Sequence, residues 1–395
     1  MERENGQGIL KTILTLLLIV YSFFVQIEGF LGSRFESAFQ ILQYVLVVVL
    51  LVSGSVLRGR IRFVGEKRNP VLPFVFLLGY LVLSLLWTND YSQGSGYILS
   101  LGLRLLMIIL AFQLTMEARE IRWIFLAMML GTVVLAVMVM GSSVTSSMET
   151  RTSLIYNDTA FDTNNLSGYL AIGLALLLNY RFRNRALEVV RYIGAGLSIV
   201  AILMTSSRGG AIAMVGAILA TGFVQRNFRN TVKYLLIVIA GGALLLFLMR
   251  QMGVSYVENL IDRFLNDPNG SGQDRLIVWR YSLQLAKRWP IFGYGIGSSF
   301  PMLQKYYRSE IGTHNVYLTF LLDGGVVGLW IFLLCLFRSL RAKRSRYTSM
   351  AKIMIVAAMI VSFFLDTYNK KILWLPLFFF ALTYSVQDQT EQEGT

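Results

Sequence analysis

The single histidine of the chain, His314, lies where a long polar stretch meets the apolar run of residues 315–338. Histidine is the side chain whose unperturbed pKa suits proton transfer near neutral pH, so a catalytic base is one interpretation. The other is a passive polar anchor at a membrane interface. One histidine is too few for the common zinc sites, which take three or four protein ligands.

Two arginines, Arg208 and Arg275, are expected on the same side of the membrane as His314. Arg208 is followed by Gly209 and Gly210, which permit a tight turn and a close approach of backbone amides to an anion. Arg275 begins a predicted helix, where a guanidinium and a helix N-terminus together suit phosphate oxygens. The alternatives are snorkelling of Arg208 to lipid headgroups and a surface ion pair of Arg275 with its neighbour.

Further polar residues are candidates for substrate binding. Arg104 is the only basic residue well inside an apolar run, about 9 Å deep at 1.5 Å per residue. Intramembrane charges suggest a functional role by default, and outward snorkelling is the alternative. Asp162, Asn164 and Asn165 open another apolar run, where they bind sugar hydroxyls or cap a helix. The remaining candidates are Arg280, Asn315 and Tyr317.

The elements that position these residues are membrane helices. The chain has 395 residues, of which 55% are hydrophobic and 15% charged, whereas soluble domains carry about 25% charge. The apolar residues cluster in blocks that match the thickness of a bilayer. The composition therefore predicts an all-α polytopic membrane protein. The lone Cys335 excludes an internal disulfide and a cysteine metal cluster.

The loops set the predicted topology. The formal charge of +14 lies mostly in every second short loop, which is the positive-inside pattern rather than a sign of a nucleic-acid partner. Basic loops in the cytoplasm place both termini inside, and residues 9–27 are expected to be an uncleaved span. About twelve spans are predicted, at about 9–27, 35–57, 71–87, 98–116, 123–141, 163–180, 192–207, 209–224, 234–250, 315–338, 353–366 and 372–386.

These runs divide the chain into four predicted parts: nine spans in residues 1–250, an external loop at 251–313, three spans in 314–386, and a disordered cytoplasmic tail at 387–395. Loops as long as 251–313 are usually functional. Within it, residues 275–289 are expected to form an amphipathic helix that lies in the headgroup layer. The glycines at 292–297 follow no strand, which excludes a dinucleotide site and favours a turn that returns the loop to the membrane.

An ordered set of motifs resembles the O-antigen ligase and O-antigen polymerase family of bacterial membrane glycosyltransferases. The resemblance runs from about residue 155 to 335, and the N-terminal third matches only in hydropathy. The motifs are Asp162-Thr-Asn-Asn-Leu-Ser-Gly, Thr205-Ser-Ser-Arg-Gly-Gly, Arg275-Leu-Ile-Val-Trp with Pro290-Ile-Phe-Gly-Tyr-Gly-Ile-Gly, and His314-Asn-Val-Tyr-Leu with Gly328 further on.

The resemblance implies a GT-C-like fold and transfer of a glycan from undecaprenyl diphosphate to an acceptor hydroxyl, at the outer face of the bacterial inner membrane. It also implies an inverting reaction that needs neither metal nor cofactor. Arg208 and Arg275 match the essential arginines of the family, and His314 matches its essential histidine.

The motifs do not separate a ligase, whose acceptor is lipid A-core, from a polymerase that extends a repeat-unit chain. A lipid-linked oligosaccharide flippase or another transporter is a further alternative, since twelve spans suit a transporter. Against it, the polar residues cluster at the external face rather than in two corresponding halves near the midplane.

Overall fold

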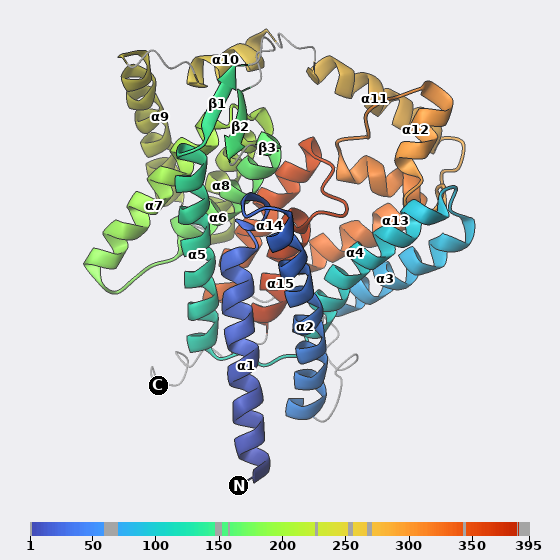
Figure 1. The fold of residues 1–395 in the computed structure, drawn as a ribbon, viewed down its shortest axis with the longest axis horizontal. Coiled ribbons are helices and arrows are strands. Elements are labelled where there is room, and N and C mark those ends of the chain that lie inside the picture. Colours follow the sequence, from blue (N-terminus) through green and yellow to red (C-terminus); the bar gives the residue numbers. More distant parts are fainter. Residues whose placement is uncertain are drawn as a thin grey trace.

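The predicted apolar runs all fall on helices. The computed structural model describes residues 2–58, 70–146, 152–156, 159–225, 228–251, 256–266, 271–342, 345–384 and 386. The helices that correspond to the runs (Figure 1) are α1 (Glu2–Phe24), α2 (Ser33–Arg58), α3 (Val71–Ser84), α4 (Tyr91–Ala111), α5 (Ala118–Met140), α6 (Thr163–Asn179), α7 (Arg185–Met204), α8 (Arg208–Gln225), α9 (Phe228–Gln251), α13 (Val316–Arg341), α14 (Arg346–Phe364) and α15 (Lys371–Tyr384).

Within the described residues, seven helices are long and apolar enough to cross a bilayer, namely α1, α2, α4, α5, α7, α13 and α14. Shorter apolar helices are α3 with the 3-10 turn η2 (Leu85–Trp87), α8, α15 and part of α9. This architecture agrees with a helical, polytopic membrane protein. The full number of twelve spans stays a prediction.

The centre of the bundle is formed by α6, α8, α14 and α15. Helix α6 is apolar on all sides and buried along most of its length, as expected for a helix in the core of a bundle. Helix α14 packs against α6, α8 and α15. The C-terminal end of α14 therefore lies next to the ends of several other helices, and the candidate site forms around it.

A small sheet interrupts the helical pattern between α5 and α6. Strands β1 (Ser143–Ser146), β2 (Thr152–Tyr156) and β3 (Thr159–Phe161) pair antiparallel in sequence order. Their β-branched and aromatic residues favour strands, although the sequence analysis predicted only a loop there. In Figure 1 the sheet lies near the end of the molecule that carries α10, opposite the start of α1.

The described residues of the predicted external loop form helices α10 (Tyr256–Leu265), α11 (Ser271–Ala286) and α12 (Ser299–Tyr307). Helix α11 covers most of the expected helix at 275–289, but it begins four residues earlier. It ends before Trp289, because a residue that precedes a proline is disfavoured in the helical region. The structure thus confirms a helix in this loop and corrects its bounds.

Candidate functional site

His314 is held in place by the start of α13. The next residue, Asn315, is the N-cap, and its side chain accepts hydrogen bonds from the amides of Tyr317 and Leu318 at 3.0 and 3.1 Å. On the other side, the Thr313 hydroxyl lies 2.6 Å from the Thr319 hydroxyl. The backbone around the half-buried histidine is therefore fixed by hydrogen bonds on both sides. Asn315 itself is buried, and its predicted contact with substrate stays a prediction.

The backbone of His314 is in the left-handed region, with φ of 46°. Ser206, two residues before Arg208, has φ of 48°. Such angles are uncommon for residues other than glycine, and they cluster at functional sites, where the surrounding structure holds them. Both candidate segments, at 205–208 and at 313–315, therefore contain a strained residue.

Helix α11 contacts the histidine segment through Trp279. The indole nitrogen of Trp279 donates to the carbonyl oxygen of Thr313 at 2.8 Å, and its ring packs edge-on against Phe363 at 5.3 Å. Arg275 precedes Trp279 by one helical turn, and residues four apart share a helix face. The half-buried Arg275 thus lies on the face of α11 that is turned toward the His314 segment.

The segment of Arg208 is joined to the motif at 162–165. The Ser207 hydroxyl donates to the side-chain oxygen of Asn164 at 2.9 Å. A Cβ added to Gly210 would lie 2.2 Å from the Cβ of Ser167, so this glycine is needed where α8 packs against α6. Gly210 therefore has a packing role, in addition to the predicted role of Gly209 and Gly210 in binding an anion.

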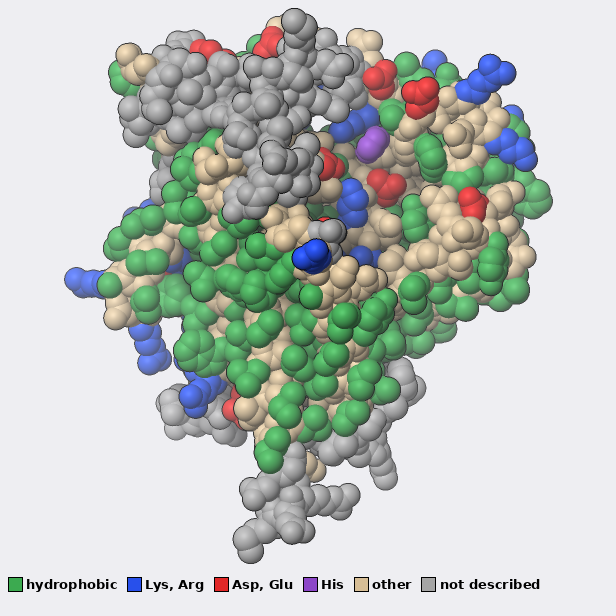
Figure 2. Space-filling view, viewed as in Figure 1, with side chains coloured by type: hydrophobic (Ala, Val, Ile, Leu, Met, Phe, Trp, Pro, Cys, Tyr) green, Lys and Arg blue, Asp and Glu red, His purple; other side chains and the backbone are tan. Residues whose placement is uncertain are grey.

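The end of α14 is the common neighbour of all these segments. Phe363 contacts Trp279 as described and also Tyr317, at 6.2 Å between ring centroids. Phe364 lies beside Gly209, whose added Cβ would be 3.1 Å from the Phe364 Cβ. Three motifs that are far apart in sequence therefore border the short stretch 363–366. Figure 2 shows the histidine, in purple, beside basic and acidic side chains, beyond the apolar surface of the bundle.

Asp366 is an acidic residue of this region that the sequence analysis did not single out. It lies two residues beyond α14, and its carboxylate is 3.9 Å from the Cβ position of Gly312. Burial raises the pKa of the Asp366 carboxyl, while the amide of Tyr368 and the charge of Lys370 oppose the shift. The sequence feature that could have identified Asp366 is its position as an acidic residue at the very end of the apolar run 353–366.

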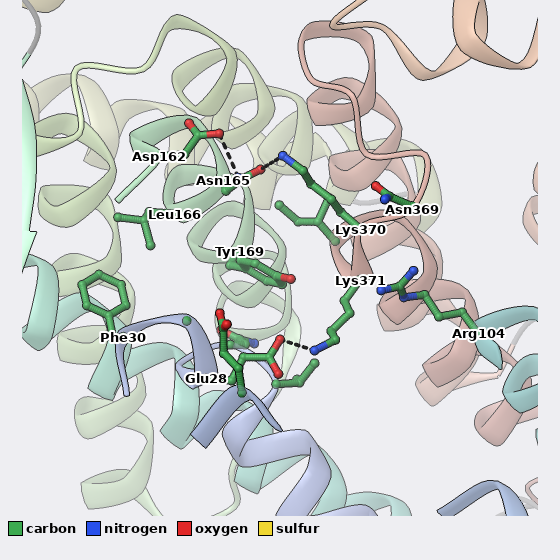
Figure 3. Close-up of a pocket in the computed structure, with 15 residues that line it drawn as sticks. Glu28, Phe30, Arg104, Asp162, Asn165, Leu166, Tyr169, Asn369, Lys370 and Lys371 are labelled. Atoms are coloured by element: carbon green, nitrogen blue, oxygen red, sulfur yellow. Dashed lines mark hydrogen bonds and ion pairs between the residues drawn. The ribbon is translucent and has the colours of Figure 1, made fainter. Parts of the chain in front are cut away.

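The motif at 162–165 both caps α6 and reaches across to Lys370, the residue before α15. Asp162 accepts from the amide of Asn164 at 2.9 Å and from the side chain of Asn165 at 2.8 Å. The side-chain oxygen of Asn165 accepts from Lys370 at 3.2 Å, as Figure 3 shows. The capping alternative is confirmed for Asp162, and sugar binding by this motif stays a prediction.

The other predicted residues lie at different distances from this centre. Tyr317 is half-buried and donates its hydroxyl to the carbonyl of Met359 at 3.0 Å. Arg280 is exposed on α11. Arg104 lines a separate cavity with Asp162 and Asn165, so it is close to the motif that contacts the Arg208 segment. In the part of the chain that the structure describes, no group of three or more histidine, cysteine or acidic side chains could hold a metal ion.

The glycines at 293, 295 and 297 anchor the long loop to α13. The amides of Tyr294 and Gly295 donate to the carbonyls of Leu322 and Asp323 at 2.8 and 2.9 Å. The buried Asp323 carboxylate accepts from the amides of Gly297 and Ser299 at 2.8 and 2.7 Å. These bonds confirm the predicted turn and join it to α13, and the return of the loop to the membrane stays a prediction. Asp323 was missed, although an acid inside an apolar run is itself a signal.

The backbone conformation explains why this turn needs glycine. Gly293 has φ of 67° and faces Gly325, where α13 is kinked with φ of 61°. A Cβ on Gly293 would lie 2.4 Å from the Gly325 nitrogen. Only two glycines permit this approach of backbone to backbone, and it fixes the loop that carries α11 relative to α13.

The fold and the site define a helical membrane protein whose polar motifs meet at one end of the bundle. Residues 193–333 match the family described as O-antigen ligase. The matched range includes Arg208, Arg275 and His314, and it confirms the resemblance to the O-antigen ligase and polymerase family. No curated protein matches the chain.

Proposed function

We propose that the protein is a glycosyltransferase of O-antigen ligase type in the bacterial inner membrane. It moves a glycan from undecaprenyl diphosphate to a hydroxyl of lipid A-core at the periplasmic face. The observation that carries this proposal is the meeting of the Arg208, Arg275 and His314 segments around residues 363–366, through Gly209 with Phe364, Trp279 with Phe363, and Tyr317 with Phe363.

The two arginines act on the leaving group. As the bond between the anomeric carbon and the diphosphate oxygen breaks, negative charge grows on the diphosphate, and fixed cations stabilise charge where it develops. Arg208 is the first residue of α8, so the positive end of that helix adds to the guanidinium. In this role the arginines and the helix end replace a divalent cation, and the reaction is independent of metal.

His314 acts as the general base. The acceptor oxygen forms its bond to the anomeric carbon on the face opposite the departing diphosphate, which inverts the configuration. The hydroxyl proton passes to the imidazole, a step that typically contributes about 10²–10⁴-fold to the rate. Because the donor is tethered to the membrane, less entropy is lost when the reactants meet.

The same proposal places the site at the periplasmic side of a GT-C-like bundle of twelve spans with both termini in the cytoplasm. The arrangement of the long loop supports it, since α10 and α11 lie at the end of the molecule opposite the start of α1 (Figure 1). The strongly basic segments, such as residues 338–346 at the end of α13 and beyond it, then face the cytoplasm.

Transfer by the purified, detergent-solubilised protein tests the proposal. Donor lipid is supplied with and without lipid A-core, and the products are separated by mass. A ligase forms product only with the core, whereas a polymerase lengthens the donor glycan without it. Export of the donor lipid across vesicles with no transfer would instead identify a flippase.

Two variants test the assigned roles. His314→Ala and Arg275→Ala are each expected to abolish transfer and to leave the thermal unfolding midpoint unchanged. Lys287→Ala removes an exposed cation from the same loop and serves as the matched control, with turnover like that of the wild type. Wild-type turnover by the histidine variant, or complete loss of activity in a metal chelator, would refute the mechanism.

A further inference from the structure

A polar cavity lies beside the candidate site. Its volume is about 430 Å³, within the roughly 300–1,000 Å³ typical of small-molecule sites. It is bordered by the short 3-10 helix η1 (Glu28–Phe30), α4, α6 and the start of α15. Figure 3 shows Arg104, Glu28 and Lys371 on one side of it and Asp162, Asn165 and Lys370 on the other.

Four buried polar atoms of the lining have no hydrogen-bond partner among the described residues. They are Nε and Nη1 of Arg104, Nε2 of Gln26 and Oε2 of Glu28. Buried polar atoms in native proteins nearly always have a partner, and each exception needs an explanation. Three unpaired donors and one unpaired acceptor that border the same cavity indicate that a bound polar molecule completes these hydrogen bonds.

The charges of the lining show what kind of molecule is needed. Lys371 forms an ion pair with Glu28, and Lys370 donates to the neutral side chain of Asn165. Arg104 has no ion pair within the described part of the chain, and it belongs to a membrane-spanning helix. The lining also contains the carboxylates of Glu28, Glu36 and Asp162. Glu28 acts on the charge of Arg104 but already forms an ion pair with Lys371, and Asp162 accepts hydrogen bonds from Asn164 and Asn165. A guanidinium whose buried nitrogens have no acceptor is unfavourable, and the acceptor that suits it best is an anion.

We propose that this cavity binds an oxyanion, a carboxylate or a phosphate, on a molecule that also carries hydroxyl groups. Arg104 donates to the oxyanion, the amide of Gln26 donates to an oxygen, and Glu28 accepts from a hydroxyl. Two kinds of molecule have this chemistry: an acidic sugar of the transferred glycan, and the headgroup of an anionic lipid such as phosphatidylglycerol. The first kind rests on the proposed function, and the second does not.

The position of the cavity suits a sugar of the substrate. Asp162 and Asn165 line the cavity, and Asn164 between them in sequence accepts from Ser207, the neighbour of Arg208. A glycan whose diphosphate lies at Arg208 is thus a short distance from the cavity. Recognition of an acidic sugar there would make the enzyme select its glycan by charge.

Binding to the full-length protein in nanodiscs tests the inference. The discs contain only phosphatidylcholine in one arm and added phosphatidylglycerol in the other. The soluble probes are a disaccharide that contains glucuronic acid and its neutral glucose counterpart, measured by calorimetry and by the shift of the thermal midpoint, which rises when a ligand binds the folded state. The wild type is expected to bind the acidic disaccharide, the anionic lipid or both, and the neutral disaccharide at least tenfold more weakly.

The variants assign the binding to the cavity. Arg104→Gln is expected to weaken binding of the acidic probe at least tenfold, and the exposed Lys287→Gln to leave it unchanged. Because Nε and Nη1 of Arg104 have no hydrogen-bond partner among the described residues, its removal should not lower the midpoint measured without ligand. If R104Q nevertheless fails to fold, Gln26→Leu gives the same test with a severalfold loss of affinity.

Each outcome has a definite meaning. Loss of binding of the acidic disaccharide in R104Q identifies an acidic sugar, and loss confined to phosphatidylglycerol identifies a lipid headgroup. Wild-type affinity of R104Q for both, or equal binding of the neutral disaccharide, overturns the inference. His314→Ala keeps the two proposals apart, since it should bind the acidic probe normally and transfer nothing. An active H314A would refute the proposed function and leave the cavity as an oxyanion site.

Discussion

The indole nitrogen of Trp279 donates a hydrogen bond of 2.8 Å to the carbonyl oxygen of Thr313, the residue before His314. This bond connects the helix that carries Arg275 to the segment that carries the only histidine. Trp279 and Thr313 are 34 positions apart in sequence. The long loop is therefore a part of the site, and its position determines the distance between a proposed leaving-group cation and the proposed base.

Trp279→Phe tests this connection. Phenylalanine keeps a ring against Phe363 but removes the donor, so the Thr313 carbonyl loses its partner at a cost of about 1 kcal/mol. Turnover is expected to fall about tenfold with a small change in the unfolding midpoint, measured by transfer assay and thermal unfolding. Trp289→Phe changes an exposed indole in the same loop and should behave like the wild type. If both variants were equally active, the bond would not position the site.

The strained backbone of His314 allows its chemical and structural roles to be separated. His314→Gly removes the imidazole and places at φ of 46° the residue that adopts this angle most easily. Transfer is expected to fall by about 10²–10⁴-fold, while the stability stays equal or increases by a few tenths of a kcal/mol to about 1 kcal/mol.

Arg308→Gly is the matched control for that variant. Arg308 has φ of 53° at the end of α12, so glycine relieves the same kind of strain there. It should be stabilised in the same way and keep its activity. A similar loss of turnover in both variants would show that the backbone, rather than the imidazole, matters at these positions.

The sequence predicts the features that depend on local composition. All twelve apolar runs fall on helices, because hydropathy over a bilayer-length window is a property of neighbouring residues. The predicted boundary between the runs 192–207 and 209–224 lies close to the observed break between Met204, where α7 ends, and Arg208, where α8 begins. Asp162 caps α6 as its residue type indicates. The family motifs also placed the three candidate residues in the range that matches O-antigen ligase.

The features that depend on distant partners could not be predicted. Glu28 and Lys371 form an ion pair across 343 positions of sequence, and nothing near either residue identifies the other. The sequence suggested that Gly210 lets the backbone approach an anion, whereas the structure shows that it lets α8 approach Ser167 of α6. No local sequence pattern identifies Ser167 as its neighbour. Asp323 was hidden for the same reason, because its partners are the amides of Gly297 and Ser299 in the returning loop.

Gly210→Ala tests the packing of the Arg208 segment. Its new Cβ would lie 2.2 Å from the Ser167 side chain, and overpacking of this kind costs about 1–3 kcal/mol. We expect a lower unfolding midpoint and a lower turnover, because α8 must move with Arg208 at its start. Gly196→Ala in α7, where nothing lies within 4 Å of the added Cβ, should gain up to about 1 kcal/mol. Equal stability of the two variants would contradict the close contact of α6 and α8.

The raised pKa of Asp366 predicts how stability changes with pH. Burial keeps this carboxyl protonated in the folded protein at pH values where the unfolded chain has already lost the proton. The folded state then binds more protons than the unfolded state, so this group's contribution to stability falls as pH rises above about 4, the ordinary carboxyl pKa, and through the folded-state value. Asp366→Asn removes the titration and keeps the shape. Its unfolding midpoint should exceed that of the wild type at pH 7, and the difference should shrink as the pH is lowered to 4.

The comparison variant is Asp90→Asn. The Asp90 carboxyl caps α4 by accepting from the Gln93 amide, so this variant should not be stabilised at pH 7. A midpoint for Asp366→Asn that is below the wild type at pH 7 would mean that the ionised carboxylate, held by Lys370 and the Tyr368 amide, is the form that the folded site requires.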